Sequence, residues 1–471
     1  MTLSVCVIGA GPSGLPALKA ALDAGFDCDC YEKGEMIGGL WADTVNGAAY
    51  DSLVINTNKD MMQYADYPMP DEWPEYVPRL KIVEYFKHYA EAFRLNDHIF
   101  LNHEVTSAKR KEQGGWSVTV KNIKGQTTKS KEYDILLVAN GHHGKPKLPA
   151  GSEYPGLDQF TGIQMHSHEY QSPLAHDLKG KRVLVVGGGN SAMDIACELG
   201  NPGLQNKVVI SMRRGVYVWP KWVLGKPTTL LLKYGPKNPP RWYSKLTGVL
   251  TMWLFMPNLE KFGMPKPDHA CSDTHPTISD NFAPAIRDQK VIVKPGLKQV
   301  SGNTVTFQRI PGNKHHTHET QETFDVIIWC TGYYVHLPFL DKSIVESRHN
   351  YIPLWHRMIK PGIMDLAFIG LFQPLGAVMP LAEAQAKLYM QFLKGEVSFP
   401  VDYVMETEIE RRRKDHNTQF YQSDRHAMEE FQYHFLDVLQ SYSTHHRDTY
   451  TALRAFSKEP LKHARQPVTE S

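Results

Sequence analysis

The sequence predicts an α/β protein with two Rossmann-like dinucleotide-binding domains. Two stretches of the 471-residue chain share one pattern, in which a short apolar run is followed by a glycine cluster, a helical stretch and a second apolar run. The first stretch begins at Ser4 and the second at Arg182. Each has the order of the opening strand, helix and strand of a dinucleotide-binding fold, so two such domains are expected.

The first unit carries a GxGxxG motif in the segment VIGAGPSG, where Gly9, Gly11 and Gly14 hold the three glycine positions. The first glycine permits a tight turn, the second lets a pyrophosphate approach the backbone, and the third lets the helix pack on the strand. Glu32 ends the next apolar run, 21 residues after Gly11, where a carboxylate accepts hydrogen bonds from ribose hydroxyls. This unit is therefore expected to bind a nucleotide with a free 2′-hydroxyl, such as FAD.

The second unit reads VVGGGNSAMD, with Gly187 and Gly189 in the motif and Ala192 in the third position, where alanine is tolerated. The next apolar run ends in SMRRG, so Arg213 and Arg214 stand where the first unit has its glutamate. Guanidinium groups suit phosphate oxygens, whereas a carboxylate would repel a 2′-phosphate. NADPH is expected here, with Arg213 as the main phosphate contact and Arg214 assisting.

The rest of the chain predicts further regular elements around these units. The proline-rich residues 236–241 predict an irregular insertion over about 222–280. The other expected elements are a helix over 80–93, an antiparallel strand over 116–120, short apolar strands over 135–139 and 326–330, and a helix over 381–394 that Gly395 ends.

The composition argues against several classes of protein. The formal net charge is +2 without a long basic block, so nucleic-acid binding has no electrostatic support. The longest apolar run, 246–256, has about half the ~20 residues of a bilayer span. The N-terminus lacks a signal-peptide pattern, and the six cysteines form no CxxC pair, as in a reducing cytosol. We expect a cytoplasmic protein without a stable membrane anchor.

A family resemblance rests on the segment between the two glycine clusters. FTGIQMHSHEY, from Phe160 to Tyr170, matches the FxGxxxHxxxY/F fingerprint of the flavin-containing monooxygenases. Baeyer–Villiger monooxygenases end this fingerprint with Trp followed by Pro or Asp, whereas Tyr170 and Gln171 stand here. Membrane-bound relatives carry an apolar C-terminal anchor, whereas this chain ends in the polar KHARQPVTES, so it resembles a soluble, microbial-type member.

The resemblance extends over nearly the whole chain. GGLW at 38–41 is similar to the family's GGxW near the flavin, and residues 52–68 are similar to the segment with an active-site asparagine. WCTGY at 329–333 is similar to the ATGY strand end that links the domains, with Cys330 in place of the usual alanine. Residues 371–387 are similar to the C-terminal flavin-side segment.

The resemblance implies an NADPH- and O2-dependent monooxygenase. NADPH reduces bound FAD, the flavin reacts with O2 to give a C4a-hydroperoxide, and a soft nucleophile takes the distal oxygen. The implied substrates are small amines, sulfides and indole-like heterocycles, and a homodimer is compatible with the pattern. The implied catalytic residues are Asn56, Tyr170 and His166, and the implied cofactor contacts are Gly9, Gly11, Pro12, Ser13, Gly14, Glu32, Lys33, Gly39, Leu40, Trp41, Asn56, Thr57, Gln373, Gly187, Gly189, Asn190, Ser191, Arg213 and Arg214.

The three implied catalytic residues have structural alternatives. The neutral amide of Asn56 suits a position between the flavin and the nicotinamide, and the alternative is a turn asparagine that satisfies its own backbone. His166 would order the interdomain hinge, or would be a core histidine. Tyr170 would cover NADP+ or hold a water near the flavin, or would only pack.

The expected domain division follows the same resemblance. The FAD domain would hold residues 1–168 and 325–471, with an NADPH domain of residues 169–324 inserted, and the active site would lie between them. Three other functions stay open, namely a Baeyer–Villiger monooxygenase acting on ketones, a disulfide-type reductase and a non-catalytic NADPH and flavin sensor. The reductase would need a redox-active cysteine pair, which the sequence lacks.

Three other features have simpler interpretations. His315, His316 and His318 lie in a polar stretch and are expected in a hairpin loop, with no metal site. Cys28 and Cys30 are expected to face the core. The aromatic-rich run 242–262 would touch a membrane surface, line a substrate tunnel or form a core or interface patch.

Overall fold

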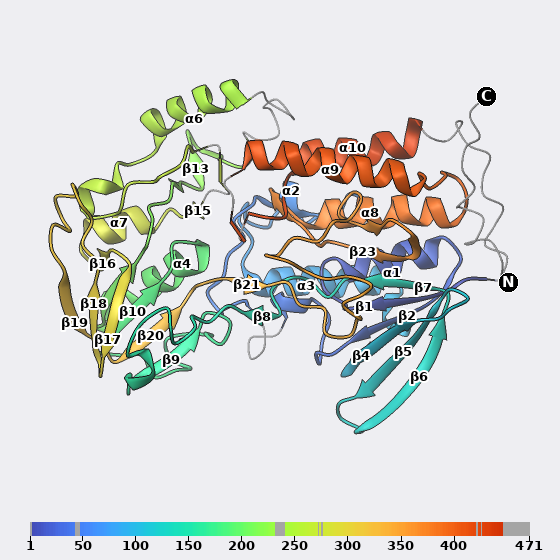
Figure 1. Ribbon diagram of the computed structural model, residues 1–471, viewed down its shortest axis with the longest axis horizontal. Helices are drawn as coiled ribbons and strands as arrows, with labels where there is room; N and C mark the ends of the chain where they lie inside the picture. The colour runs from blue at the N-terminus through green and yellow to red at the C-terminus, as the bar shows by residue number, and fades with distance from the viewer. Residues whose placement is uncertain are drawn as a thin grey trace.

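Two mainly parallel sheets stand side by side in the computed structural model, one built on each glycine unit (Figure 1). The structure describes residues 2–42, 48–230, 241–271, 273–274, 277–420, 423–424 and 426–445. The predicted α/β class with two Rossmann-like units is confirmed, because each sheet has its glycine turn between a first strand and a helix.

The first sheet has six strands, and it draws them from both ends of the described chain. Its central strand β1 (Ser4–Ile8) pairs in parallel with β2 and β7, and α1 (Gly14–Asp23) connects β1 to β2 as predicted. In sheet order the strands are β22 (Ile359–Lys360), β23 (Ile363–Phe368), β7 (Ile135–Val138), β1, β2 (Asp27–Glu32) and β3 (Ile99–Leu101).

Helices and a small antiparallel sheet surround the first sheet. The three-stranded sheet β4–β5–β6 projects from it at the lower right of Figure 1, and α8, α9 and α10 lie above it. The bounds are α3 (Arg79–Ala92), β4 (His103–Arg110), β5 (Trp116–Asn122), β6 (Thr127–Tyr133), α8 (Met379–Leu393), α9 (Asp402–Gln419) and α10 (Gln432–His445). The predicted helices at 80–93 and 381–394 and the antiparallel strand at 116–120 are confirmed.

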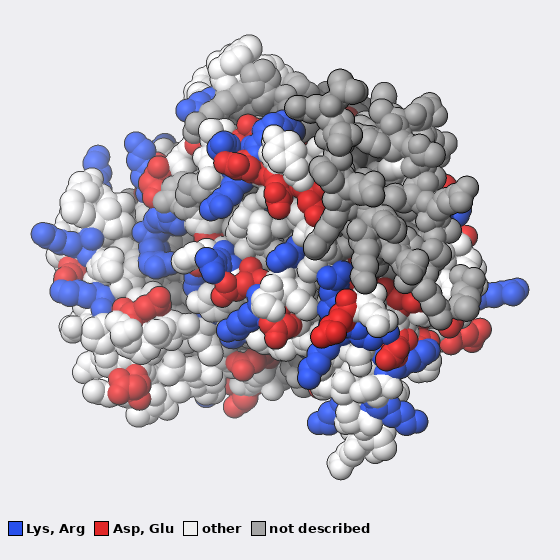
Figure 2. Space-filling view, turned by 45° about the vertical axis from the view of Figure 1, so that its right-hand side comes forward, with Lys and Arg blue, Asp and Glu red and all other residues white. Residues whose placement is uncertain are grey.

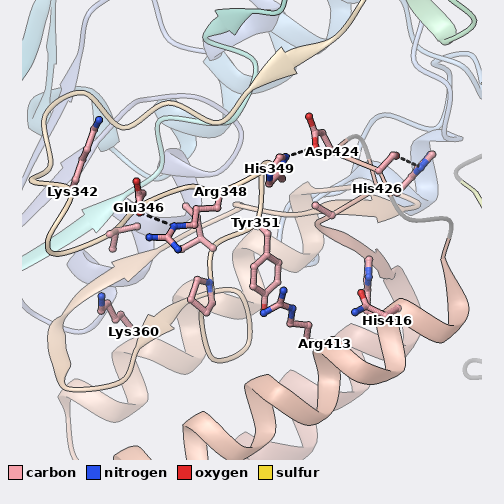
Figure 3. A pocket seen from close by; sticks show the side chains of 16 residues that line it. Lys342, Glu346, Arg348, His349, Tyr351, Lys360, Arg413, His416, Asp424 and His426 are labelled. Atoms are coloured by element: carbon pink, nitrogen blue, oxygen red, sulfur yellow. Dashed lines mark hydrogen bonds and ion pairs between the residues drawn. The ribbon is translucent and has the colours of Figure 1, made fainter.

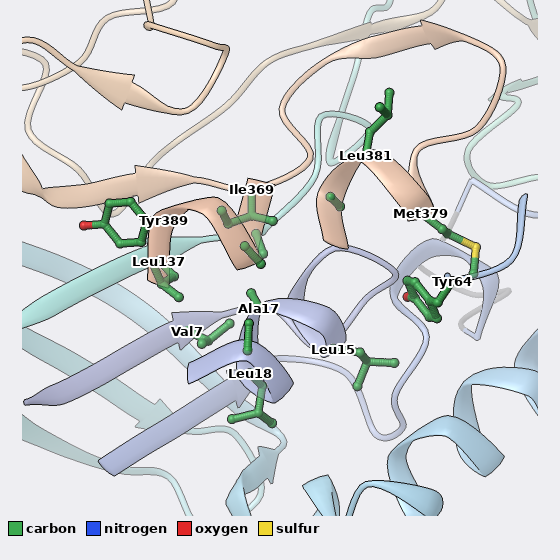
Figure 4. Close-up of a cluster of buried hydrophobic side chains, with 14 of the residues drawn as sticks. Val7, Leu15, Ala17, Leu18, Tyr64, Leu137, Ile369, Met379, Leu381 and Tyr389 are labelled. Carbon is green, nitrogen blue, oxygen red and sulfur yellow. The ribbon is translucent and has the colours of Figure 1, made fainter. Parts of the chain in front are cut away.

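The core of this half joins residues that are distant in the sequence (Figure 4). Val7 of β1 and Leu137 of β7 lie with Ala17 of α1 against Leu381 and Tyr389 of α8, and all five side chains are fully buried. Burial of each large apolar side chain contributes about 1.5–3 kcal/mol, so these contacts hold the N-terminal unit against the C-terminal helix.

The second sheet draws its strands from the middle of the chain. Its order is β16 (Val291–Lys294), β11 (Lys207–Ser211), β10 (Arg182–Val186), β20 (Val326–Trp329) and β9 (Ile163–His166). The helices α4 (Asn190–Leu199) and α7 (Phe282–Arg287) pack on it, and a three-stranded antiparallel sheet adjoins it, formed by β17 (Leu297–Ser301), β18 (Thr304–Phe307) and β19 (Thr320–Thr323).

Two strands fall on the other side of the expected domain boundaries. The boundaries at 168/169 and 324/325 would leave β9 and β20 with the first domain, whereas both pair into the second sheet through β10. The sequence predicted a strand at β20 and none at β9. It did not indicate the neighbours of either strand, because pairing between distant strands leaves no local mark in a sequence. A second domain that includes both strands follows the pairing, and the division into domains stays a proposal.

Short elements complete the described chain. These are η1 (Gly39–Trp41), α2 (Lys59–Met62), η2 (Leu95–His98), η3 (Leu157–Gln159), η4 (Pro202–Leu204), η5 (Leu259–Phe262), and the pairs β8 (Lys145–Pro146) with β21 (Tyr333–Tyr334), β12 (Val218–Trp219) with β15 (Thr277–Ile278), β13 (Trp222–Val223) with β14 (Lys226–Pro227), and β24 (Gln373–Leu375) with β25 (Glu429–Phe431).

The insertion over 222–280 is less irregular than expected. It contains α6 (Arg241–Phe255), a helix of 15 residues, because the proline-rich residues end where the helix begins. Residues 236–240 of the proline-rich segment lie outside the described residues. Within the part of the chain that the structure describes, every helix is too short or too polar to span a bilayer.

Candidate functional site

The first glycine turn has no room for side chains at its first and third glycines. Gly9 has φ +101°, and a Cβ there would lie 2.8 Å from the carbonyl oxygen of Ala139. A Cβ on Gly14 would overlap the carbonyl oxygen of Gly9. The turn therefore requires glycine at both positions, and it presents the N-terminus of α1 to a ligand, where phosphate groups are stabilised.

Glu32 is buried at the end of β2, beside this turn. Its Oε2 accepts a hydrogen bond from the Ala10 amide at 2.8 Å, and its Oε1 accepts one from the Gly34 amide at 2.7 Å. A carboxylate has about four lone-pair sites, so the oriented group still accepts from ribose hydroxyls. Lys33, the neighbouring candidate contact, is exposed.

The GGLW segment lies directly against the first glycine turn. A Cβ on Gly39 would lie 3.0 Å from the Cα of Gly11, so the two backbones touch. Leu40 and Trp41 follow in η1, and the Trp41 carbonyl accepts a hydrogen bond from Arg79 Nη1 at 2.9 Å. This contact links the segment to the start of α3.

The segments around Asn56 and Gln373 approach the same turn. The Tyr64 hydroxyl donates to the Pro12 carbonyl at 2.7 Å, and a Cβ on Gly370 would overlap the hydroxyl of Ser13. The Thr57 hydroxyl donates to the Gly376 carbonyl at 3.2 Å, which ties one segment to the other. Segments that are more than 300 residues apart thus meet around the first glycine turn.

Asn56 fits a site that holds a bound group. Its Oδ1 is buried, and no hydrogen-bond donor of the described residues reaches it. A buried polar atom of this kind costs free energy unless a ligand or water supplies the donor. Gln373, the other polar candidate, is half-buried, and its backbone N–H donates to the Met428 carbonyl at 2.9 Å.

The second glycine turn is equally tight. Gly187 has φ +146°, and a Cβ there would overlap the carbonyl oxygen of Cys330, so the WCTGY strand end lies against the turn. Gly189 precedes α4, whose first residues are Asn190 and Ser191. Asn190 Oδ1 accepts from the Ile278 amide at 2.9 Å, so its side chain is oriented by β15.

The two candidate phosphate-binding arginines differ in their surroundings. Arg213 and Arg214 are both exposed just after β11. Arg214 pairs with Asp268 at 3.7 Å, whereas no carboxylate of the described residues lies within ion-pair distance of Arg213. Arg213 is therefore the freer of the two to bind a 2′-phosphate, in line with the sequence-based prediction.

Two tyrosines join the segment before Asn56 and the fingerprint to α4. The Tyr50 hydroxyl donates to Asp194 Oδ2 at 2.5 Å, and the Tyr170 hydroxyl donates to Glu198 Oε2 at 2.7 Å. Both tyrosine side chains are buried, and their rings meet edge to face. For Tyr170 this arrangement favours a positioning role, and a contact with NADP+ stays a prediction.

Sequence reasoning missed Tyr50 and both acidic partners. Asp194 and Glu198 lie four residues apart and hence on one face of α4. Two carboxylates on one face of a helix whose apolar residues are buried were the signal in the sequence that could have indicated buried partners. Burial raises the pKa of both carboxyl groups, and the tyrosine hydrogen bonds oppose that shift. Burial is the larger cause for both groups, so the net pKa of each carboxyl group lies above its usual value.

The insertion also reaches the Asn56 segment. Lys221 Nζ donates to the Ile55 carbonyl at 3.1 Å, and burial lowers the pKa of this lysine. The Thr229 hydroxyl contacts Asn58 at 3.2 Å. The segment of Asn56 is therefore held by residues of the insertion at Ile55 and at Asn58.

His166 lies where the two halves of the chain cross. It ends β9, is 1% exposed, and its ring packs edge to face on Tyr333 at 5.1 Å between ring centres. His143 contacts the same tyrosine ring at 4.7 Å. Burial lowers the pKa of His166 to about 4, so its ring is neutral at pH 7. These contacts suit the predicted hinge position, and its role stays a prediction.

The histidines and cysteines that were set aside have structural explanations. His315, His316 and His318 lie in the loop between β18 and β19, as expected, but His316 is buried, and one of its ring nitrogens lies 2.7 Å from the Gly263 carbonyl oxygen. Cys28 and Cys30 are fully buried, as predicted. Among the described residues no cluster of three or more His, Cys, Asp or Glu is arranged to hold a metal ion.

A cavity of about 710 Å³ lies apart from both glycine turns (Figure 3). Its walls come from residues between 342 and 360, from the end of α9, and from Ser423, Asp424, His426 and Ala427. Several charged groups of the lining are already paired, since Arg348 contacts Glu346 at 2.8 Å and His349 contacts Asp424 at 3.1 Å. None of the predicted cofactor contacts lines this cavity, so we place the candidate site at the glycine turns.

Comparisons with known proteins identify relatives over nearly the whole chain. The sequence model of the flavin-binding monooxygenase-like family matches residues 2–453. Flavin-containing monooxygenase 5 of Rattus norvegicus is 34% identical over 449 residues, which cover 90% of this chain and 80% of that protein. Dimethylaniline monooxygenase [N-oxide-forming] 2 of Oryctolagus cuniculus is 32% identical over 461 residues, which cover 93% and 82%.

Solved structures share the fold. S-allyl-L-cysteine S-oxygenase from Allium sativum superposes with a TM-score of 0.68 at 21% identity, and the match covers 94% of this chain and 89% of that one. At this identity the likeness supports the two-domain architecture alone.

Proposed function

The chain belongs to the flavin-containing monooxygenase family, and from that premise we propose that it oxygenates soft nitrogen or sulfur atoms of small molecules. Family membership makes the protein an NADPH-dependent oxidoreductase that uses FAD and NADP(H) and takes O2 with a small-molecule substrate. The atom that receives oxygen is the part that we propose.

The observation that carries the proposal is Tyr170 at the end of the fingerprint. Baeyer–Villiger enzymes have Trp there, whereas Tyr170 is fully buried with its hydroxyl on Glu198. A relative that is 32% identical is named for N-oxide formation, which supports the same chemistry. Oxygenation of ketones is the second candidate function, and the test below includes it.

FAD, when bound, takes a hydride from NADPH and activates O2, and the residues of this chain position the reactants. Glu32, oriented by two backbone amides, would hold the ribose of FAD. Arg213 would hold the 2′-phosphate of NADPH. Asn56 would place a neutral amide, with its free Oδ1, between the two cofactors without adding charge. Tyr50 would hold the segment before Asn56 on α4, and Tyr170 would hold the end of the fingerprint on the same helix.

The substrate class is tested with the purified enzyme, NADPH and ¹⁸O2. We expect ¹⁸O in the N-oxide of a tertiary amine or the sulfoxide of a thioether, and no lactone from cyclohexanone. Lactone as the main product would contradict the proposal and support the ketone alternative.

The role of Asn56 is tested by Asn56→Asp, which replaces an amide donor by a negative charge. We expect the variant to retain FAD and to form no oxygenated product. Asn201→Asp is the matched control, because Asn201 is exposed and an aspartate there keeps the acceptor for the Gly203 amide. Full oxygenation by Asn56→Asp would refute this role.

A further inference from the structure

The cavity beside the end of α9 is large enough for a small molecule. Its volume of about 710 Å³ lies within the range of roughly 300–1,000 Å³ that is typical of ligand pockets. Four lysines and arginines line it against two acidic residues, and these are Lys342, Arg348, Lys360 and Arg413 against Glu346 and Asp424 (Figure 3). The lining therefore carries a surplus of two positive charges.

This surplus is a local feature of the molecule. The whole chain has 52 lysines and arginines and 50 aspartates and glutamates. Basic and acidic side chains are interspersed over the face that Figure 2 shows. A concave site with a surplus of one sign of charge concentrates ligands of the opposite sign, so the cavity favours an anion.

Both acidic residues of the lining are already paired. Glu346 contacts Arg348 at 2.8 Å. Asp424 contacts His349 at 3.1 Å, and it also contacts Lys147, which lies outside the lining, at 3.1 Å. The two carboxylates are therefore engaged by these partners and leave the other cations of the lining uncompensated.

Three cations of the lining have no acidic partner. In the described part of the chain, no carboxylate lies within ion-pair distance of Lys342, Lys360 or Arg413. The Lys360 ammonium donates to the Ile344 carbonyl, which orients the side chain without neutralising its charge. The Arg413 guanidinium lies over the ring of Tyr351, 5.1 Å from the ring centre. Lys360 and Arg413 are thus held in place and remain available to an anion.

The ring of Tyr351 is itself fixed from the protein side. Arg357 contacts it at 5.7 Å from the ring centre, and Arg357 pairs with the buried Glu430 at 2.8 Å. Apolar side chains continue the wall beside this ring, with Val345 and Ile352 both buried. The cavity therefore combines cations with a rigid apolar wall, which suits an anion that has an organic part.

His416 of α9 adds a neutral hydrogen-bonding group to the lining. Its Nε2 is buried, and no hydrogen-bonding group of the described residues reaches that atom. Burial lowers the pKa of His416 to about 4, so the ring is neutral at pH 7. A buried polar atom of this kind is stabilised when a ligand or a water supplies the missing partner.

We propose that this cavity binds a phosphate monoester of a small organic molecule. A phosphate monoester carries about −1.5 to −2 charges at pH 7, which matches the surplus of the lining. The guanidinium of Arg413 suits two phosphate oxygens, and Lys360 adds a point charge. The organic part contacts Val345 and Ile352. None of the predicted FAD and NADPH contacts lines the cavity, so this ligand is separate from both coenzymes.

The site is tested by isothermal titration calorimetry of the full-length holoenzyme with FAD and saturating NADP+, which fill the coenzyme sites. We expect phenyl phosphate to bind, and we expect phenol and inorganic phosphate to bind at least tenfold more weakly, roughly the effect of one lost charged hydrogen bond or more. Binding of phenyl phosphate should weaken in about 0.5 M NaCl, because salt screens the charges of an open cavity.

Two substitutions each remove one cation from the cavity. Arg413→Gln and Lys360→Gln should each weaken the binding of phenyl phosphate roughly tenfold, with flavin content unchanged as evidence of folding. Arg411→Gln is the matched control, because Arg411 is an exposed arginine of the same helix that lies outside the lining and contacts Asp415 at 3.7 Å.

Three results would overturn the proposal. The first is that phenyl phosphate fails to bind the wild-type enzyme with or without NADP+. The second is that inorganic phosphate binds as tightly as phenyl phosphate, or that Arg411→Gln weakens binding as much as Arg413→Gln. The third is binding that NADP+ abolishes, since the coenzyme site would then be the one that holds the probe.

Discussion

Replacing Arg213 by alanine removes the cation that we expect to bind the 2′-phosphate of NADPH. Arg213 is exposed after β11, and no described carboxylate is within ion-pair distance of it. Its neighbour Arg214 already pairs with Asp268 at 3.7 Å, so Arg214 is expected to take over the role of Arg213 only in part. NADH has no 2′-phosphate, so its use should not depend on Arg213.

The size of the effect follows from the exposure of the side chain. Hydrogen bonds between charged groups contribute about 1.5–3 kcal/mol, and exposure to solvent places Arg213 near the lower end of that range. A loss of about 1.5 kcal/mol corresponds to roughly a tenfold change in an equilibrium constant. Arg213→Ala should therefore lower kcat/KM for NADPH about tenfold, and Arg214→Ala should lower it less.

The assay is steady-state oxidation of NADPH and of NADH by the flavin-loaded enzyme. The ratio of kcat/KM for NADPH to kcat/KM for NADH measures the contribution of the 2′-phosphate alone, because damage elsewhere in the site lowers both values. Arg287→Ala is the control, since Arg287 is a surface arginine of α7 that pairs with Asp288 at 3.0 Å. An unchanged ratio in Arg213→Ala would refute the assignment.

Three further predictions concern single residues. Gly14→Ala should prevent folding of the first unit, because its Cβ would overlap the Gly9 carbonyl, whereas Gly11→Ala should fold but lose flavin. Circular dichroism and flavin absorbance distinguish the two variants, and a Gly14→Ala variant that binds flavin would contradict the reasoning. Tyr170→Phe should destabilise the protein by about 1–3 kcal/mol in thermal unfolding, and the double variant with Glu198→Gln should cost less than the sum of the single variants; additive effects would argue against the coupling. Since the pKa of His166 is about 4 in the folded protein and about 6.5 when unfolded, the unfolded chain binds the proton first, so stability is lost as pH falls from 6.5 towards 4. His166→Gln should flatten that part of the pH–stability curve, and an unchanged slope would show that His166 does not cause the loss.

Local chemistry was sufficient to predict the glycine turns and the elements around them. The contact that requires Gly14 is with Gly9, five residues earlier, and Gly9 has a positive φ in a tight turn. Glu32 and Arg213 each follow one strand after their glycine turn, so short motifs contain this information. The helix α3 and strand β5 were likewise recognisable from the period of their apolar residues.

Contacts between distant segments were beyond reach of the same reasoning. The acidic partners of Tyr50 and Tyr170 lie 144 and 28 residues further along the chain, on α4, and the pairing of β20 with β9 joins residues that are more than 150 apart. The apolar side chains of α6, such as Trp242 and Trp253, are exposed although they recur with the helical period that is normally buried, so the sequence alone did not determine which way this helix faces.

The most direct test of the central claim is a stopped-flow experiment in which NADPH-reduced enzyme is mixed with O2. A monooxygenase with a water-excluding site between Asn56 and the two glycine turns should give a flavin absorbance spectrum that persists and differs from those of reduced and oxidised flavin. Immediate return of the oxidised spectrum with release of one hydrogen peroxide per flavin would contradict the claim and indicate an oxidase, a reductase or a sensor.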